Sequence, residues 1–194
     1  MGTKIILLSI CCCFMFVASS QETKKKQYHF HSINSLAMLN GDNGVSAAIQ
    51  TVNGFTKGQW FAGIGMGLDY YQYRSVPVFA HLQYEFGQTR NKFFLYGDAG
   101  VNCSWVQKEF YITPTIWNGE RVNNFNNGMY TDAGMGLKSA FKNGNAFILS
   151  LGYSRKAMVE RIEYTDGWSG RELEEVNRYR FNRIVLKLGL QFRN

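Results

Sequence analysis

The chain has 194 residues, a formal net charge of +7 and an aromatic content of 15%. This length suffices for one domain with a full core. A basic balance can indicate a nucleic-acid partner, but acidic and basic residues are mixed along this sequence, and we expect no nucleic acid to bind. No run of about 20 apolar residues follows position 20, so we expect no transmembrane helix there.

The first 20 residues have the layout of a secretory signal peptide. Lys4 precedes an apolar run over 5–17, and the small residues Ala18, Ser19 and Ser20 follow it. We expect cleavage after Ser20, a short periplasmic leader over 21–27 and one barrel domain over 28–194. A lipid anchor on Cys11 is the alternative, but Ile10 stands where such a site needs a small residue.

Three of the four cysteines leave with this peptide, and Cys103 remains alone. The mature chain is therefore expected to have no internal disulfide and no cysteine metal site. We expect no metal and no cofactor.

Beyond position 27 the sequence alternates between apolar and polar residues, which predicts strands. We expect eight, near 28–39, 44–55, 59–72, 76–87, 92–106, 128–141, 146–160 and 178–192. Turn-forming segments separate several of them, at 40–44, 53–58, 88–91 and 142–145. Eight antiparallel strands without a helix predict an all-β sandwich or a closed up-and-down barrel.

Each strand has an apolar and a polar face. The apolar face of the better-defined strands carries no charged residue, whereas the polar face is rich in glycine, as in "FAGIGMGLDYY" over 61–71. Seven charged residues and one histidine share the polar face, and we expect them to form an interior network of ion pairs. They are Asp69, Glu85, Asp98, Asp132, Lys138, Arg183, Lys187 and His81.

Alternation alone does not say which face is inside. A soluble lipocalin-like barrel would turn the apolar face inward around an apolar ligand, and a membrane barrel would turn it outward to lipid. The glycines favour the membrane barrel, because the interior of eight strands is only just wide enough for side chains. The lengths of the connections favour it too: 88–91 and 142–145 are short, whereas 107–127 and 161–177 are long.

Aromatic residues gather at the two ends of the apolar face, which is typical of membrane interfaces. At the periplasmic rim we expect Trp60, Phe86, Phe93, Phe141, Phe147 and Phe192, and at the other rim Tyr70, Trp105 and Tyr153.

The signal peptide, the eight strands and the segments "GIGMGLDYY", "FFLYGDAGV" and "RIVLKLGLQF" together resemble the small outer-membrane β-barrels of Gram-negative bacteria, the OmpX- and OmpA-like barrels of the porin-like superfamily. The resemblance implies an eight-stranded transmembrane barrel in the cell outer membrane, with membrane lipid and the barrel-assembly machinery as partners. That family commonly ends on an aromatic residue, whereas here Arg193 and Asn194 follow Phe192.

Several functions are open to such a barrel. We expect a monomer without an open pore and without catalysis, because no Ser/His/Asp set gathers at one rim. A lipid-modifying enzyme is the alternative.

The long connections are the expected site of function. We predict hairpins that turn at Asn118-Gly119 and at Asp166-Gly167 and extend beyond the membrane. Their aromatic residues could bind an unknown surface partner: Tyr111, Trp117, Phe125, Tyr164 and Trp168. The alternative is a solvated loop whose charges pair across strands, among them Glu160, Arg161, Glu163, Arg178 and Arg180.

Overall fold

The computed structural model describes residues 28–87, 90–105, 110–111, 118–166 and 169–193. The predicted signal peptide and leader lie outside these residues. The strands are β1 (His29–Gly41), β2 (Gly44–Lys57), β3 (Trp60–Asp69), β4 (Ser75–Phe86), β5 (Asn91–Ser104), β6 (Phe110–Tyr111), β7 (Asn118–Asn126), β8 (Gly128–Ala140), β9 (Ala146–Asp166) and β10 (Glu172–Arg193). Among the described residues there is no helix that is long and apolar enough to cross a membrane.

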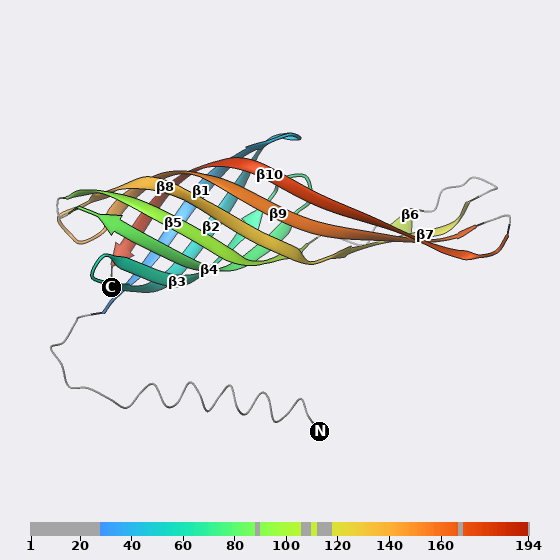
Figure 1. Cartoon of the computed structure of the whole chain (residues 1–194), viewed down its shortest axis with the longest axis horizontal. Coiled ribbons are helices and arrows are strands. Elements are labelled where there is room, and N and C mark those ends of the chain that lie inside the picture. The colour runs from blue at the N-terminus through green and yellow to red at the C-terminus, as the bar shows by residue number, and fades with distance from the viewer. Residues whose placement is uncertain (1–27, 88–89, 106–109, 112–117, 167–168, 194) are drawn as a thin grey trace, which may run out of the picture.

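Eight of the strands form a closed antiparallel barrel (Figure 1). Each of β1 to β4 pairs with the next strand, β5 pairs with β8, β8 with β9 and β9 with β10, and β10 returns to β1. The closure leaves no free edge within the barrel, which is how a sheet satisfies its backbone groups in lipid. The predicted barrel of eight strands is confirmed.

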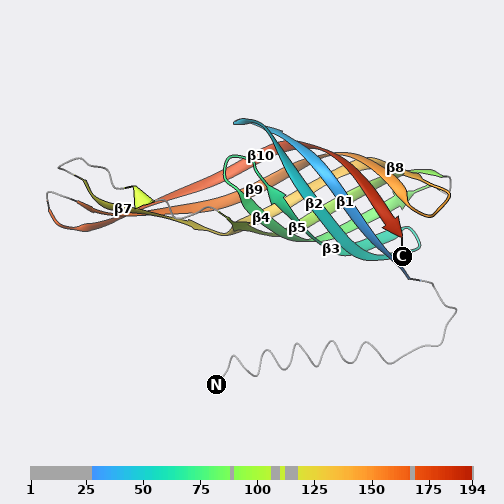
Figure 2. The ribbon, with the colours of Figure 1, turned by 180° about the vertical axis from the view of Figure 1, so that it is seen from behind.

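The two ends of the barrel differ (Figure 2). One end of the barrel, which we call the turn end, holds the start of β1 and the end of β10. The short connections 58–59 and 141–145 lie there too, and so do the end of β4 and the start of β5. At the other, the ribbon end, β9 and β10 continue far beyond the barrel. The connection predicted over 53–58 is shorter than expected, since β2 runs to Lys57, and β3 stops at Asp69 rather than at 72.

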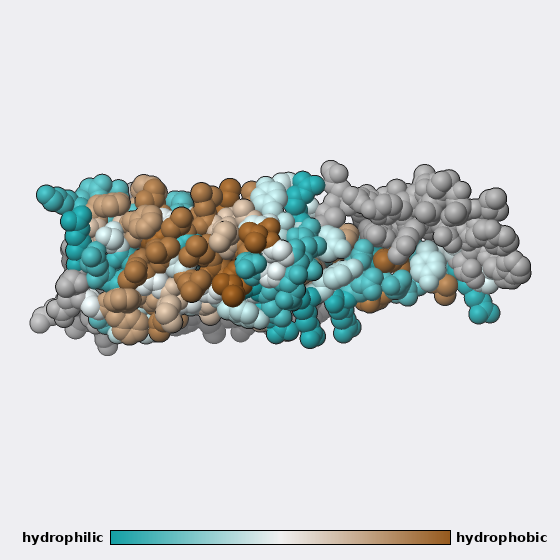
Figure 3. All heavy atoms as spheres, turned by 90° about the horizontal axis from the view of Figure 1, so that it is seen from above, coloured by the Kyte–Doolittle hydropathy of each residue, from teal (hydrophilic) through white to brown (hydrophobic). Residues whose placement is uncertain are grey.

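Side chains alternate between the lumen and the outside. Ile64 and Leu188 point outward and are 70% and 49% exposed, whereas Phe61 and Arg183 point inward and are each 1% exposed. On the face seen in Figure 3 the outward apolar residues form a band, with polar residues at both ends of it. A lipocalin-like barrel around an apolar ligand is therefore wrong, because the apolar face is on the outside.

The inward glycines make room for large neighbours. A Cβ on Gly65 of β3 would overlap the ring of Phe79, and one on Gly136 of β8 would overlap the ring of Phe94. The alternating glycines of β3 and β8 therefore allow aromatic side chains to fill a narrow lumen.

Candidate functional site

The lumen holds three groups of ion pairs, stacked along the barrel. Nearest the ribbon end, the carboxylate of Asp69 on β3 accepts from Arg183 on β10 at 2.5 Å and from Lys156 on β9 at 3.1 Å. The backbone N–H of Tyr71 donates to the same carboxylate at 2.8 Å. Lys156 also donates to the carbonyl oxygens of Tyr71 and Tyr73, at 2.8 and 3.0 Å. This group ties three distant strands to the connection that follows β3.

The second group lies at the middle of the lumen. The ammonium of Lys187 lies 2.8 Å from the carboxylate of Asp132 and 3.5 Å from that of Asp98. Asp98 also contacts Nδ1 of His81 at 2.5 Å. Tyr96 donates its hydroxyl to Asp132 at 3.0 Å, and its ring lies 4.6 Å from the Lys187 ammonium.

The third group lies near the turn end. The carboxylate of Glu85 on β4 accepts hydrogen bonds from the ammonium groups of Lys138 on β8, at 2.6 Å, and of Lys92 on β5, at 3.1 Å. The structure thus places all eight predicted interior residues in the lumen and in ion pairs. The predicted network did not include Lys92 and Lys156, which lie near the ends of their barrel segments. The sequence does indicate that Lys156 points inward, because Lys156 lies two positions after the inward Ser154 on the same strand.

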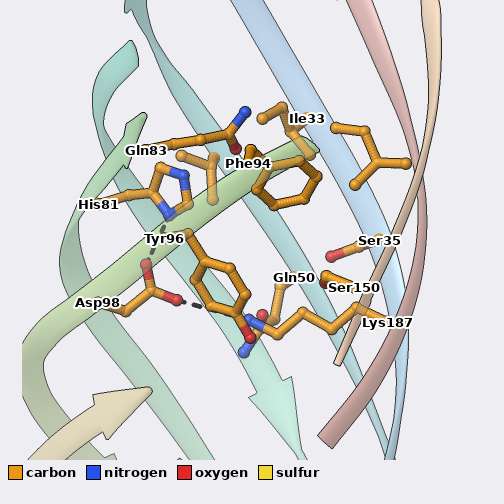
Figure 4. Close-up of a pocket in the computed structure, with 12 residues that line it drawn as sticks. Ile33, Ser35, Gln50, His81, Gln83, Phe94, Tyr96, Asp98, Ser150 and Lys187 are labelled. Atoms are coloured by element: carbon orange, nitrogen blue, oxygen red, sulfur yellow. Dashed lines mark hydrogen bonds and ion pairs between the residues drawn. The ribbon is translucent and has the colours of Figure 1, made fainter. Parts of the chain in front are cut away.

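A small cavity, lined by both apolar and polar side chains, lies beside the second group (Figure 4). Its volume is about 30 Å³, and its polar lining includes Ser35, His81, Asp98, Ser150 and Lys187. A cavity of this size has room for water. His81 binds Asp98 through Nδ1, and within the described chain its Nε2 has no hydrogen-bond partner. Neither serine therefore contacts His81 as a nucleophile contacts its base.

Among the described residues no group of three histidine, cysteine or acidic side chains is arranged to hold a metal ion. In the lumen group around Asp98 and Asp132, both carboxylates pair with the ammonium of Lys187.

The nine residues predicted as aromatic girdles all point outward and are exposed. Six lie toward the turn end: Trp60, Phe86, Phe93, Phe141, Phe147 and Phe192. The other three, Tyr70, Trp105 and Tyr153, lie toward the ribbon end. They border the apolar band on both sides, as interfacial aromatics do.

Beyond the barrel the sheet continues as a four-stranded external sheet in the order β10-β9-β7-β6, which we call the ribbon. β7 pairs with the outer half of β9, from Asn126↔Val159 to Asn118↔Asp166. β7 and β8 form one nearly continuous strand along β9. One extra residue lies between the pairs Asn126↔Val159 and Tyr130↔Lys156, as in a β-bulge.

The predicted turn at Asn118-Gly119 is wrong, because both residues belong to strand β7. β6 pairs with β7 through Phe110↔Val122 and Tyr111↔Arg121, so the connection falls within 112–117, outside the described residues. Pairing with β9 outweighs the local preference of Asn-Gly for a turn.

Of the loop candidates that the structure describes, Tyr111 and Tyr164 share one row across the ribbon, with Arg121 between them, and Phe125 lies elsewhere. Trp117 and Trp168 lie outside the described residues, and Tyr111 belongs to β6. Tyr164 is 36% exposed on the ribbon. Phe125 instead packs against Tyr73, with ring centroids 5.0 Å apart.

Phe125 is part of an aromatic cluster at the base of the ribbon. Tyr179 stacks on Phe181 at 6.0 Å, and Tyr73 contacts both of these rings. Tyr179 also donates its hydroxyl to Glu160 at 2.8 Å. That hydrogen bond to the carboxylate, with some burial, raises the pKa of Tyr179 well above its usual value. The cluster covers the ribbon end of the lumen.

The alternative prediction for this segment is a solvated loop whose charged side chains pair across the strands, and the structure contains only part of that pairing. Arg161 pairs with Glu174 at 3.2 Å. Glu160 points to the opposite face, toward Tyr179, and therefore does not meet Arg178 or Arg180.

No family model matches this chain, and no curated relative matches it. Several solved structures resemble it, among them two outer-membrane or surface proteins. The solid-state NMR structure of the outer membrane protein AlkL in DMPC lipid bilayers aligns over 91% of this chain and 94% of that one, with a TM-score of 0.54 and 9% identity. The crystal structure of Neisserial surface protein A (NspA) aligns over 84% and 95%, with a TM-score of 0.47 and 12% identity.

The fold is thus that of a small outer-membrane β-barrel, as AlkL has it. With its exposed apolar band, this fold agrees with the predicted location in the outer membrane.

Proposed function

We propose that this protein is a surface-recognition barrel of the Gram-negative outer membrane, which presents the ribbon outside the cell. The observation that carries the proposal is the unequal construction of the two ends. The turn end has short connections. At the ribbon end β9 and β10 extend outward, and β7 and β6 pair beside β9 to form the ribbon. Long external segments and short periplasmic turns are typical of outer-membrane barrels.

The ribbon has a feature suited to a protein partner. β1 pairs with β10 only from Arg183 to Arg193, so among the residues that the structure describes the stretch from Glu172 to Asn182 pairs with β9 alone. Its other side is an open strand edge. Such an edge can take up an extended segment of a partner as an additional strand.

The filled lumen supports recognition rather than conduction. Arg183, Lys156, Phe61 and Tyr130 are almost completely buried, so side chains occupy the interior at several depths. Catalysis has no comparable support, since the pair of His81 and Asp98 is enclosed in the lumen and holds no serine. We therefore propose a non-catalytic protein without an open pore. Membrane lipid and the barrel-assembly machinery are its other proposed partners.

The orientation is tested by labelling. In a Cys103→Ser background, Thr165→Cys places one thiol on the ribbon, and Lys142→Cys places the matched control on an exposed connection at the turn end. We expect a membrane-impermeant maleimide to label the ribbon thiol on intact cells and the control only after permeabilisation. The reverse pattern would overturn the proposal.

The role of the ribbon is tested by shortening it. In the shortened variant, two-residue turns replace 105–127 and 161–176, so that β5 connects directly to β8. We expect cells with the full-length protein to bind at least one component of an immobilised panel of fibronectin, laminin and collagen, and cells with the shortened barrel to lose this binding. Equal binding by both, with a weaker barrier to detergents in the shortened variant, would indicate a structural role instead.

A further inference from the structure

A row of three arginines lies on the outer surface, immediately beyond the apolar band. Arg155 on β9 and Arg178 and Arg180 on β10 are all exposed and point outward. The pairing Asn182↔Arg155, Arg180↔Ala157 and Arg178↔Val159 sets them on successive rows of the same face. Arg155 and Arg180 are therefore diagonal neighbours, with Cβ atoms about 7–8 Å apart.

The arginines have no carboxylate partner among the described residues. Arg161 and Glu174 form an ion pair on the same outward face of β9 and β10, but they lie farther from the barrel than the three arginines. Asp42, in the turn between β1 and β2, forms no ion pair with them. Three like charges on adjacent rows repel one another, and this arrangement favours an anionic ligand.

The depth of the row indicates what this ligand is. Tyr153 and Ile184 lie directly opposite each other and end the apolar band on these two strands, and each is 56% exposed. The row of Arg155 follows two residues farther out. Two residues span about 7 Å along a strand, which a tilt of about 45° reduces to about 5 Å of height. The headgroup layer is about 5–8 Å thick, so Arg155 lies at its level. Arg180 and Arg178 lie one and two rows farther out, about 10 and 14 Å above Ile184 by the same estimate, and border the layer on its outer side.

We propose that Arg155, Arg178 and Arg180 form a binding site for the phosphate groups of a lipid headgroup in the external leaflet. Guanidinium groups match phosphate oxygens with paired hydrogen bonds. The acyl chains of this lipid would lie against Tyr153 and Ile184 below. The site uses the outer wall of the barrel and the orientation proposed above, but it needs no partner on the ribbon.

The test is a titration with one phosphorylated lipid. Purified protein in neutral detergent is titrated with lipid A that carries both phosphates, and bound lipid is counted by native mass spectrometry. The comparison variant is Arg155→Gln/Arg178→Gln/Arg180→Gln. The matched control, Lys57→Gln/Arg90→Gln/Lys142→Gln, removes the same charge at the turn end. A shift in gel mobility on boiling verifies that each variant is folded.

Each basic residue near an anionic membrane surface contributes about a fivefold factor, so we expect the arginine variant to bind lipid A on the order of 100-fold more weakly. The control should bind as the native protein does, and dephosphorylated lipid A should bind weakly to all three. Equal loss in both variants, or equal binding of dephosphorylated lipid, would overturn the proposal. Competition by millimolar inorganic phosphate alone would indicate a free-phosphate site and would overturn it too. These outcomes leave the labelling of Thr165→Cys unchanged, so the two proposals fail separately.

Discussion

Asp69→Asn tests how the lumen is held together, because this one carboxylate neutralises two buried cations. Arg183 and Lys156 are both completely enclosed, and Asp69 is the acid that each contacts. The substitution keeps the size of the side chain but leaves two positive charges without a counter-ion. Breaking a buried ion pair by removal of one partner costs about 3–5 kcal/mol. We expect a loss in this range in the free energy of unfolding.

A second variant distinguishes the cost of unpaired charge from the cost of a packing defect. Adding Arg183→Met to Asp69→Asn removes one of the two unpaired cations, so the double variant should be more stable than Asp69→Asn alone, by about 2 kcal/mol or more. A mere packing defect at Asp69 would instead make the double variant less stable.

The assay is urea unfolding in lipid vesicles at pH 7, followed by tryptophan fluorescence. Glu174→Gln is the matched control, because it breaks the exposed pair with Arg161, which is expected to contribute at most about 1 kcal/mol. If Asp69→Asn costs no more than Glu174→Gln, the network does not hold the barrel together as described.

Three further variants probe the wall of the barrel and the base of the ribbon. Leu188→Arg places a charge on the lipid face and should cost about 2–4 kcal/mol in the same unfolding assay, and an unchanged midpoint would contradict the outward assignment. Gly65→Ala should cost about 1–3 kcal/mol, because its Cβ overlaps the ring of Phe79, and adding Phe79→Leu should recover part of this loss. Tyr179→Phe removes the donor to Glu160 and should cost about 1–3 kcal/mol at the ribbon base, seen as faster amide exchange in the outer parts of β9 and β10 while exchange in β1 to β4 is unchanged.

The strict two-residue period made the barrel predictable from sequence. A one-residue slip would turn every side chain to the other face, so the parity of β3, with Ile64 and Met66 alternating with glycines, identifies the wall and the lumen at once. The same parity placed Asp69 and Arg183 on one face, although 114 residues separate them in the sequence.

The ribbon was less predictable, because β7 is set by pairing and not by local pattern. The extension of β9 and β10 agrees with the hairpin predicted around Asp166-Gly167, and Ile162, which is 3% exposed, keeps the inward parity there. Asn118-Gly119 has the local signature of a turn, yet β7 pairs with β9 on both sides of Gly119, at Asn118 and from Arg121 onward, with a shift of register between them. Phe125 looked like an exposed recognition residue, but its inward parity places it against Tyr73.

Whether the apolar face meets lipid is decided by one fractionation experiment. Cell envelopes are fractionated, the outer membrane is extracted in mild detergent, and boiled and unboiled samples are compared on SDS gels. A closed barrel has no free edge and should resist SDS until it is heated. We expect the protein to pellet with the outer membrane and to change mobility on boiling. Recovery in the soluble periplasmic fraction, with one mobility under both conditions, would contradict a membrane barrel.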